Sequence, residues 1–196
     1  MPLQRLAFTV PEGFALANGD EAVVMRPNYL QVWGIARNRG VQVRDFDLVE
    51  AIRTRRGGKL LNLDHVLLWS EPVARGWNTF MGHVRTGLSV ERKWLELGIC
   101  TVALLTGAHY EYHHHRPDFL AAGGQPQELD ALERVLAADP CQPVNDPDLG
   151  SVERLIVQYA AQITRQIQVD DTLFAALQQH LDTTGLVELT LSISAY

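Results

Sequence analysis

The sequence is short of cysteine, of long apolar runs and of clustered basic residues, and each shortage excludes a class of protein. Its two cysteines, Cys100 and Cys141, are too few and too far apart for a disulfide scaffold or a thiol-ligated metal site. No segment approaches the roughly 20 apolar residues of a membrane span, and the residues after Met1 do not form the apolar stretch of a secretory signal. We therefore expect a cytoplasmic protein with reduced thiols and no membrane partner.

Basic charge is sparse and unevenly placed. Residues 1–93 hold 13 Lys and Arg against 9 Asp and Glu, a net charge of +4, whereas residues 94–196 hold 4 against 14, a net charge of −10. A nucleic-acid-binding protein needs basic residues gathered on one face, so we expect no nucleic-acid partner. The densest basic stretch, residues 53–59, is typical of a solvated helix end stopped by Gly57 and Gly58.

Helical signals dominate the chain beyond its first quarter, and they predict an all-α protein. Capping residues and apolar periodicity predict helices over residues 47–55, 65–69, 72–86, 90–106, 108–122, 127–138, 151–167, 171–181 and from 186 to the end of the chain. Ser89 is the predicted N-cap of the helix over 90–106, and Gly107 is predicted to end that helix.

The first 45 residues are poorly defined by their sequence. Short apolar runs at residues 6–10 and 22–25 lie between prolines and glycines and could form short strands or extended arms. We therefore expect an N-terminal arm of uncertain structure over residues 1–45, followed by one helical domain over residues 46–196.

Glu96 is the only charged residue between Trp94 and Leu105. A helix that is apolar on all sides is buried, and an ionised carboxylate is costly to bury without a partner. The nearest supply of partners is the run from Tyr110 to His115, in the helix that follows Gly107. We expect the two helices to pack as a hairpin that buries Glu96 beside this run.

Four residues of the hairpin could together transfer protons. Glu111 and His115 are four residues apart and therefore share a helix face, and Tyr112 lies on the adjoining edge. With Glu96 they provide two carboxylates, a phenol and an imidazole around one gap, which are the groups an acid–base site needs. The alternative is a buried polar network that holds the hairpin together without catalysis.

A metal site is a further alternative. His109 and His113 are four residues apart, and Glu96 could add a third ligand. The run lacks a metalloprotease-type glutamate, however, and adjacent histidines point in different directions on a helix. We therefore expect neither a metal nor another cofactor.

The stretch from Leu88 to Gly123, with the run from Leu105 to His115 at its centre, resembles the carboxymuconolactone decarboxylase-like, or alkylhydroperoxidase D-like, superfamily. Residues 61–63 and 72–78 resemble the helices that precede this motif. The resemblance covers roughly residues 46–196. It implies an all-helical bundle that assembles as trimers or hexamers.

In the peroxidase branch of this superfamily, a glutamate is followed by a Cys-x-x-Cys pair and by a histidine four residues beyond the second cysteine. Glu96 and His115 match the glutamate and the histidine, but Ala108 and Glu111 stand where the cysteines would be. The ends of the proton relay are present and the dithiol is absent. Peroxiredoxin-type activity, which needs a thiolate and a resolving thiol, is therefore disfavoured.

The decarboxylase branch implies cofactor-free acid–base chemistry, and it supplies the leading hypothesis: a lyase or isomerase acting on a small carboxylate or lactone. His115 would be the general base or acid, Tyr112 would donate a hydrogen bond to a developing oxyanion, and Glu96 would hold the imidazole tautomer. Glu111 would share in the proton transfer. The competing hypothesis is a non-catalytic oligomeric or ligand-binding protein that keeps the same residues as structure.

Overall fold

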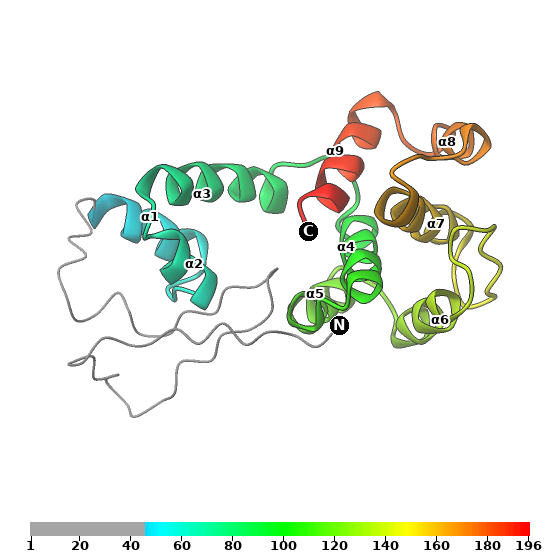
Figure 1. The fold of residues 1–196 in the computed structure, drawn as a ribbon, viewed down its shortest axis with the longest axis horizontal. Helices are drawn as coiled ribbons and strands as arrows, with labels where there is room; N and C mark the ends of the chain where they lie inside the picture. Colours follow the sequence, from blue (N-terminus) through cyan, green and yellow to red (C-terminus); the bar gives the residue numbers. More distant parts are fainter. Residues whose placement is uncertain (1–45) are drawn as a thin grey trace, which may run out of the picture. The chain divides into compact units, whose positions relative to one another are not determined.

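A computed structural model describes residues 46–196, and every regular element in this part of the chain is an α-helix. The all-α prediction is confirmed for these residues, whereas the arms or strands expected within residues 1–45 lie outside them. The chain divides into two compact units, one ending at Arg85 and one beginning at Thr86 (Figure 1). Along the described residues, none of the helices combines the length and the apolar character needed to cross a membrane.

The helix bounds agree with the predicted ones to within a few residues at most ends. The helices are α1 (Phe46–Arg55), α2 (Asn62–Leu67), α3 (Glu71–Thr86), α4 (Arg92–Thr106), α5 (His109–Ala121), α6 (Pro126–Ala137), α7 (Ser151–Gln166), α8 (Asp171–Leu177) and α9 (Thr183–Ser194). The last helix begins earlier than predicted because the side chain of Asp182 accepts a hydrogen bond from the Gly185 amide and caps it.

The first unit contains α1, α2 and α3 and has a small apolar core. Its only buried charged side chain among the described residues is Asp64, which accepts a hydrogen bond from the Leu61 amide at 2.8 Å. Arg56 pairs with Asp64 at 3.0 Å, and Arg55 lies 3.7 Å from it. The prediction of a fully solvated basic helix end is therefore wrong for these two arginines, because a buried carboxylate from α2 holds them.

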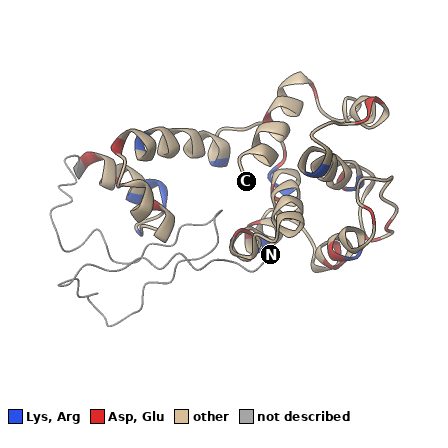
Figure 2. Ribbon diagram, in the orientation of Figure 1, with Lys and Arg blue, Asp and Glu red and all other residues tan. Residues whose placement is uncertain are grey.

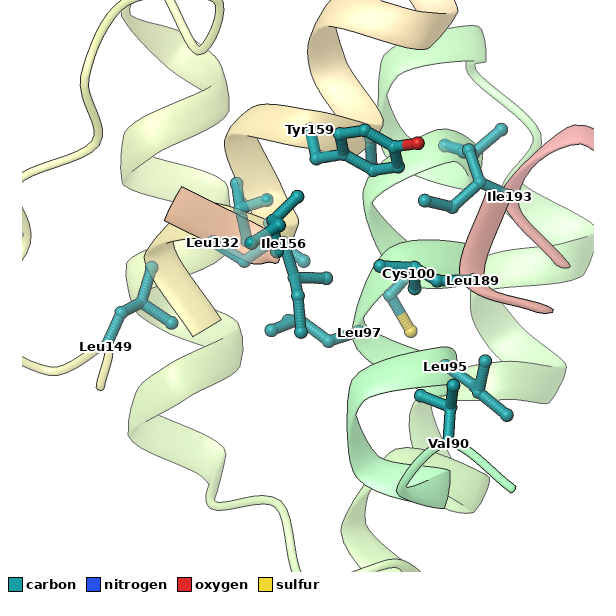
Figure 3. Packing of buried hydrophobic residues seen from close by; sticks show 14 of the residues in the cluster. Val90, Leu95, Leu97, Cys100, Leu132, Leu149, Ile156, Tyr159, Leu189 and Ile193 are labelled. Carbon is teal, nitrogen blue, oxygen red and sulfur yellow. The ribbon is translucent and has the colours of Figure 1, made fainter. Parts of the chain in front are cut away.

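The second unit is built around α4. Helices α5, α6, α7 and α9 all contact it, and every residue from Leu95 to Ala103 is buried. Figure 3 shows side chains from α4, α7 and α9 meeting in this core, among them Leu97, Ile156 and Leu189. Gly98 allows α9 to approach closely, since a Cβ atom there would lie 3.1 Å from Cγ1 of Ile193.

Helices α4 and α5 form the predicted hairpin. Gly107 adopts the left-handed conformation, with φ of 70°, and ends α4. The Ala108 amide then donates to the Ala103 carbonyl at 2.7 Å, and α5 begins at His109. The turn brings α5 back along α4, which places the histidine-rich run beside Glu96.

The segment just before α4 is held by a contact that its local sequence does not indicate. The helix begins at Arg92, and Ser89, its predicted N-cap, instead donates its amide and its hydroxyl to Oε2 of Glu188 at 2.7 and 2.8 Å. The Val90 amide donates to the same oxygen at 3.1 Å. The predicted Ser89 cap is therefore wrong: the N-cap is Glu91, which makes no side-chain capping bond, and a carboxylate from α9 instead binds the segment that leads into α4.

The second unit is strongly acidic, with 15 Asp and Glu against 6 Lys and Arg, and Figure 2 marks where these residues lie on the helices. Some of this charge is balanced within the fold. Lys93 lies 2.8 Å from Glu128 and 2.9 Å from Glu153, and so joins α4 to α6 and α7. Arg134 holds two aspartates of the loop over residues 139–148.

The hydrogen bonds to Glu188 give a prediction about stability and pH. Partial burial pushes the pKa of Glu188 upward, but the hydrogen bonds from Ser89 and Val90 outweigh it and lower the pKa below its ordinary value of 4.5. A carboxylate with a lowered pKa stabilises the fold above its unfolded pKa, and this stabilisation is lost as the pH falls through the folded pKa. Glu188→Ala should therefore cost about 0.5–1.5 kcal/mol of unfolding free energy at pH 7, and less below pH 4.5.

Urea unfolding of the parent and of Glu188→Ala at neutral and acidic pH measures this difference. Glu91→Ala is the matched control, because Glu91 occupies the N-cap position of α4 without a side-chain capping bond. An equal loss of stability in the two variants at pH 7 would contradict a stabilising role for the hydrogen bonds to Glu188.

Candidate functional site

Glu96 lies in the second turn of α4 with none of its side chain exposed. The apolar character of α4 places this position inside the bundle, and the hairpin places α5 against it. An ionised carboxylate in such surroundings needs hydrogen bonds or opposite charges close by. The site is built from the residues that supply them.

His115 is the first partner, and only 1% of its side chain is exposed. Its Nδ1 lies 2.6 Å from Oε2 of Glu96, a short, charge-assisted hydrogen bond. Because a carboxylate only accepts, Nδ1–H is the donor, and this bond sets the tautomer and orientation of the imidazole. The predicted pairing of Glu96 with His115 is present.

Glu111 lies at the other nitrogen of the same ring. Its Oε2 is 3.4 Å from Nε2 of His115, across one turn of α5. The Glu111 side chain is 15% exposed, so this carboxylate touches both the buried imidazole and solvent. The imidazole therefore lies between one fully buried carboxylate and one that reaches the surface.

Arg92 completes the surroundings of Glu96. It stands one turn earlier on α4 and pairs with Oε1, the carboxylate oxygen that His115 does not contact. The same guanidinium is 4.0 Å from Asp118 on α5. Arg92 thus places a positive charge beside the buried carboxylate of Glu96, a role that the sequence interpretation did not assign.

Among the predicted site residues, Tyr112 is the one whose polar group is bonded outside the Glu96–His115 cluster. Its hydroxyl donates to Oε1 of Glu133 on α6 at 3.2 Å. Partial burial, together with the negative charge of Glu133, raises the pKa of Tyr112 to about 12. Glu96, Glu111 and His115 are brought together, and the Tyr112 hydroxyl is held by a different helix.

Tyr196 is a neighbour of His115 that sequence reasoning missed. The two rings meet edge to face, with centroids 4.6 Å apart and an interplanar angle of 78°. This contact depends on α9 lying against α4, and no local pattern around Tyr196 indicates it. The aromatic ring adds an apolar wall to a site otherwise made of charged groups.

The potential metal ligands group differently from the predicted set. Ligand atoms of Glu96, His115 and Asp118 lie within 4.8 Å of one another, whereas the side chains of His109 and His113 are exposed on α5. Asp118 was not among the predicted ligands. The guanidinium of Arg92 pairs with Glu96 and approaches Asp118, so a bound cation would have to compete with a positive charge already present.

Comparison with known protein families, with curated proteins and with solved structures gave no match. The fold and the site therefore define only a broad class: over residues 46–196 the protein is all-helical, with a buried carboxylate–imidazole pair in a helical hairpin. The superfamily named above remains a resemblance, resting on the residues that were quoted for it.

The thiols of Cys100 and Cys141 are both buried, and we expect them to be unreactive in the native protein. Burial raises the pKa of Cys100 to about 12, and the negative charges of Glu96 and Asp118 add to this shift. Burial, together with Asp139, also raises the pKa of Cys141. Because the thiolate is the nucleophile, Ellman's reagent should react slowly with both cysteines in the native protein and quickly in denaturant.

Cys100→Ser and Cys141→Ser, measured separately, would assign the two signals. Rapid native labelling of Cys100 would show that its thiol is accessible and ionised, and would reopen thiol chemistry at this site.

Proposed function

We propose that this chain is a cofactor-free acid–base enzyme, a lyase or isomerase acting on a small carboxylate or lactone, in which His115 carries the proton. The observation that supports this most is the position of the imidazole between two carboxylates, 2.6 Å from Glu96 and 3.4 Å from Glu111. An imidazole changes charge near neutral pH, and a fixed tautomer leaves one nitrogen available to the reaction.

In this proposal each group has one task. The Nδ1–H of His115 donates to Glu96, so that Nε2 is the basic nitrogen, and the Glu96 charge stabilises the imidazolium that forms when Nε2 takes a proton. Glu111 is partly exposed and stands beside Nε2, so it can exchange that proton with substrate or solvent. Arg92 pairs with the other oxygen of the Glu96 carboxylate.

The proposed relay does not include the Tyr112 hydroxyl. That hydroxyl is bonded to Glu133, and a pKa of about 12 makes it a poor proton source near neutral pH. To serve as an oxyanion donor, Tyr112 would have to leave Glu133 and turn toward His115.

The resemblance to the carboxymuconolactone decarboxylase-like superfamily supports the same function. Glu96 and His115 stand at the family's relay positions, and Glu111 stands where its peroxidase branch has the second cysteine. In this chain a carboxylate, not a sulfur, faces Nε2 of His115. This substitution favours proton transfer over the dithiol peroxidase chemistry of the peroxidase branch.

A second candidate is a non-catalytic oligomeric or ligand-binding protein in which the cluster is structural. The observation that favours it is the nearly complete burial of His115, because a reacting group must be reached by its substrate. A satisfied buried network would also explain the pairing of Arg92 with Glu96. Stability and turnover measured on the same variants separate the two candidates.

His115→Gln keeps a hydrogen-bonding side chain of similar length but cannot carry protons near neutral pH. If His115 is the general acid or base, turnover of a small lactone or keto acid should fall roughly 10²–10⁴-fold while the melting temperature changes little. If the cluster is structural, the same change should cost about 1–3 kcal/mol of stability. Thermal melting and a substrate panel measure both quantities.

His114→Gln is the matched control, since His114 is the exposed neighbour on the same helix. Glu111→Gln and the double variant with His115→Gln test whether the two residues act as one unit, in which case their effects on rate are far from additive. A large fall in melting temperature for His115→Gln, with no turnover across the panel, would favour the structural candidate.

We further propose that the protein assembles as a homo-oligomer, with a trimer or hexamer as the form that the family resemblance implies. Helix α9 carries Val187 and Leu191 four residues apart on one face, and the Val187 side chain is 61% exposed. Exposed apolar residues on one helix face are typical of an interface between subunits.

Light scattering at micromolar concentration should then give a mass of three or six chains. Val187→Glu should lower that mass, because it places a charge in the proposed interface, whereas Thr172→Glu, at an exposed position of α8, should not. A monomer in the parent protein would reject this assembly.

A further inference from the structure

The side chains around His115 carry more negative than positive charge. Carboxylates of Glu96 and Glu111 lie at its two ring nitrogens, at 2.6 and 3.4 Å. A third carboxylate comes from Asp118, since ligand atoms of Asp118, Glu96 and His115 lie within 4.8 Å of one another. Among the residues that the structure describes, one guanidinium, that of Arg92, joins these three carboxylates. The formal charge of the cluster is therefore negative even when the imidazole is protonated.

The positive charge of Arg92 is shared between two carboxylates of the protein. Its guanidinium pairs with Glu96 and lies 4.0 Å from Asp118. Arg116 is exposed, and as the residue after His115 it points to another side of α5. A substrate carboxylate would therefore have to compete with Glu96 and Asp118 for the guanidinium of Arg92.

The members of this cluster that reach solvent are also acidic on balance. The side chains of Asp118 and Arg92 are 45% and 36% exposed, and that of Glu111 is 15% exposed. A ligand that approaches these groups meets two carboxylates and one guanidinium. The second unit as a whole has 15 Asp and Glu against 6 Lys and Arg, so its longer-range field has the same sign.

We infer that the substrate of the His115 site is uncharged: within the proposed class, it is a lactone without a free carboxylate. Repulsion between like charges about 5 Å apart near a protein surface weakens binding by about tenfold or more. The inference rests on the proposed acid–base function, because it chooses between the two kinds of substrate that this function allows.

Proton transfer makes the preference stronger. When Nε2 of His115 takes a proton from the carbon next to the lactone carbonyl, the C–H electron pair stays on the substrate as an enolate, and the imidazole becomes an imidazolium. A neutral lactone then carries one negative charge, whereas a lactone carboxylate carries two. The new charge develops near Glu111, which stands at the same nitrogen. The carboxylate should therefore lose more in rate than in binding.

The test compares two ligands of nearly the same shape, γ-carboxy-γ-butyrolactone and its carboxamide, with the whole chain at pH 7. Isothermal titration calorimetry gives the two dissociation constants. Exchange of the proton next to the lactone carbonyl into deuterated solvent, followed by NMR, gives the two rates. The carboxamide should bind at least about tenfold more tightly, and it should exchange faster by a larger factor. Raising the salt concentration from about 0.01 M to about 1 M should narrow the difference in affinity, because salt screens exposed charges.

Asp118→Asn removes one negative charge from the cluster and keeps the shape of the side chain. It should narrow the difference in affinity between the two ligands by about threefold or more, through tighter binding of the carboxylate. Asp171→Asn is the matched control, because it removes the same charge from α8, which packs against α7. The control should leave the difference in affinity unchanged.

Equal affinities, tighter binding of the carboxylate, or binding of neither ligand would overturn the inference. So would an equal effect of Asp171→Asn and Asp118→Asn, which would assign the preference to the net charge of the chain. Faster proton exchange with the carboxylate would overturn the uncharged substrate while supporting the acid–base function. Tighter binding of the carboxamide without exchange of either ligand would support the charge preference and count against the enzyme. The failure of the inference and the failure of the proposed function are therefore distinguishable.

Discussion

The buried carboxylate of Glu96, on the apolar helix α4, constrains the rest of the second unit. Glu96 is fully buried, and it is held by Arg92 on one oxygen and by His115 on the other. A buried carboxylate without such partners is strongly unfavourable. The fold must therefore bring α5 back along α4, and the turn at Gly107 allows it to do so.

The same constraint explains why the Glu96–His115 cluster fits both a structural role and a catalytic role. A buried, charge-assisted bond to Nδ1 stabilises the hairpin, and it also fixes the tautomer that a general base needs. Glu111 distinguishes the two, because a purely structural network would not need a partly exposed carboxylate beside Nε2. This geometry is the reason that the proposed function centres on His115 and Glu111 and leaves Tyr112 outside the relay.

Some predictions failed because they used only neighbours in sequence. Ser89 was predicted to cap α4 with its own side chain, but Glu188 of α9 accepts its hydrogen bonds. The basic helix end was expected to be solvated, but Asp64 holds Arg55 and Arg56. In each case a charged residue from a different helix competes successfully for a group whose local pattern has a simpler explanation.

The sequence by itself determined the helices, the hairpin and the pairing of Glu96 with His115. These follow from periodicity, from a glycine in a left-handed turn and from the cost of burying one carboxylate, all of which act over a few residues or between adjacent helices. Only the tertiary structure decided the hydrogen bond of Tyr112 to Glu133 on α6 and the ring contact of Tyr196 with His115. Those contacts depend on how helices that are distant in the sequence pack around α4, and no local sequence pattern determines this packing.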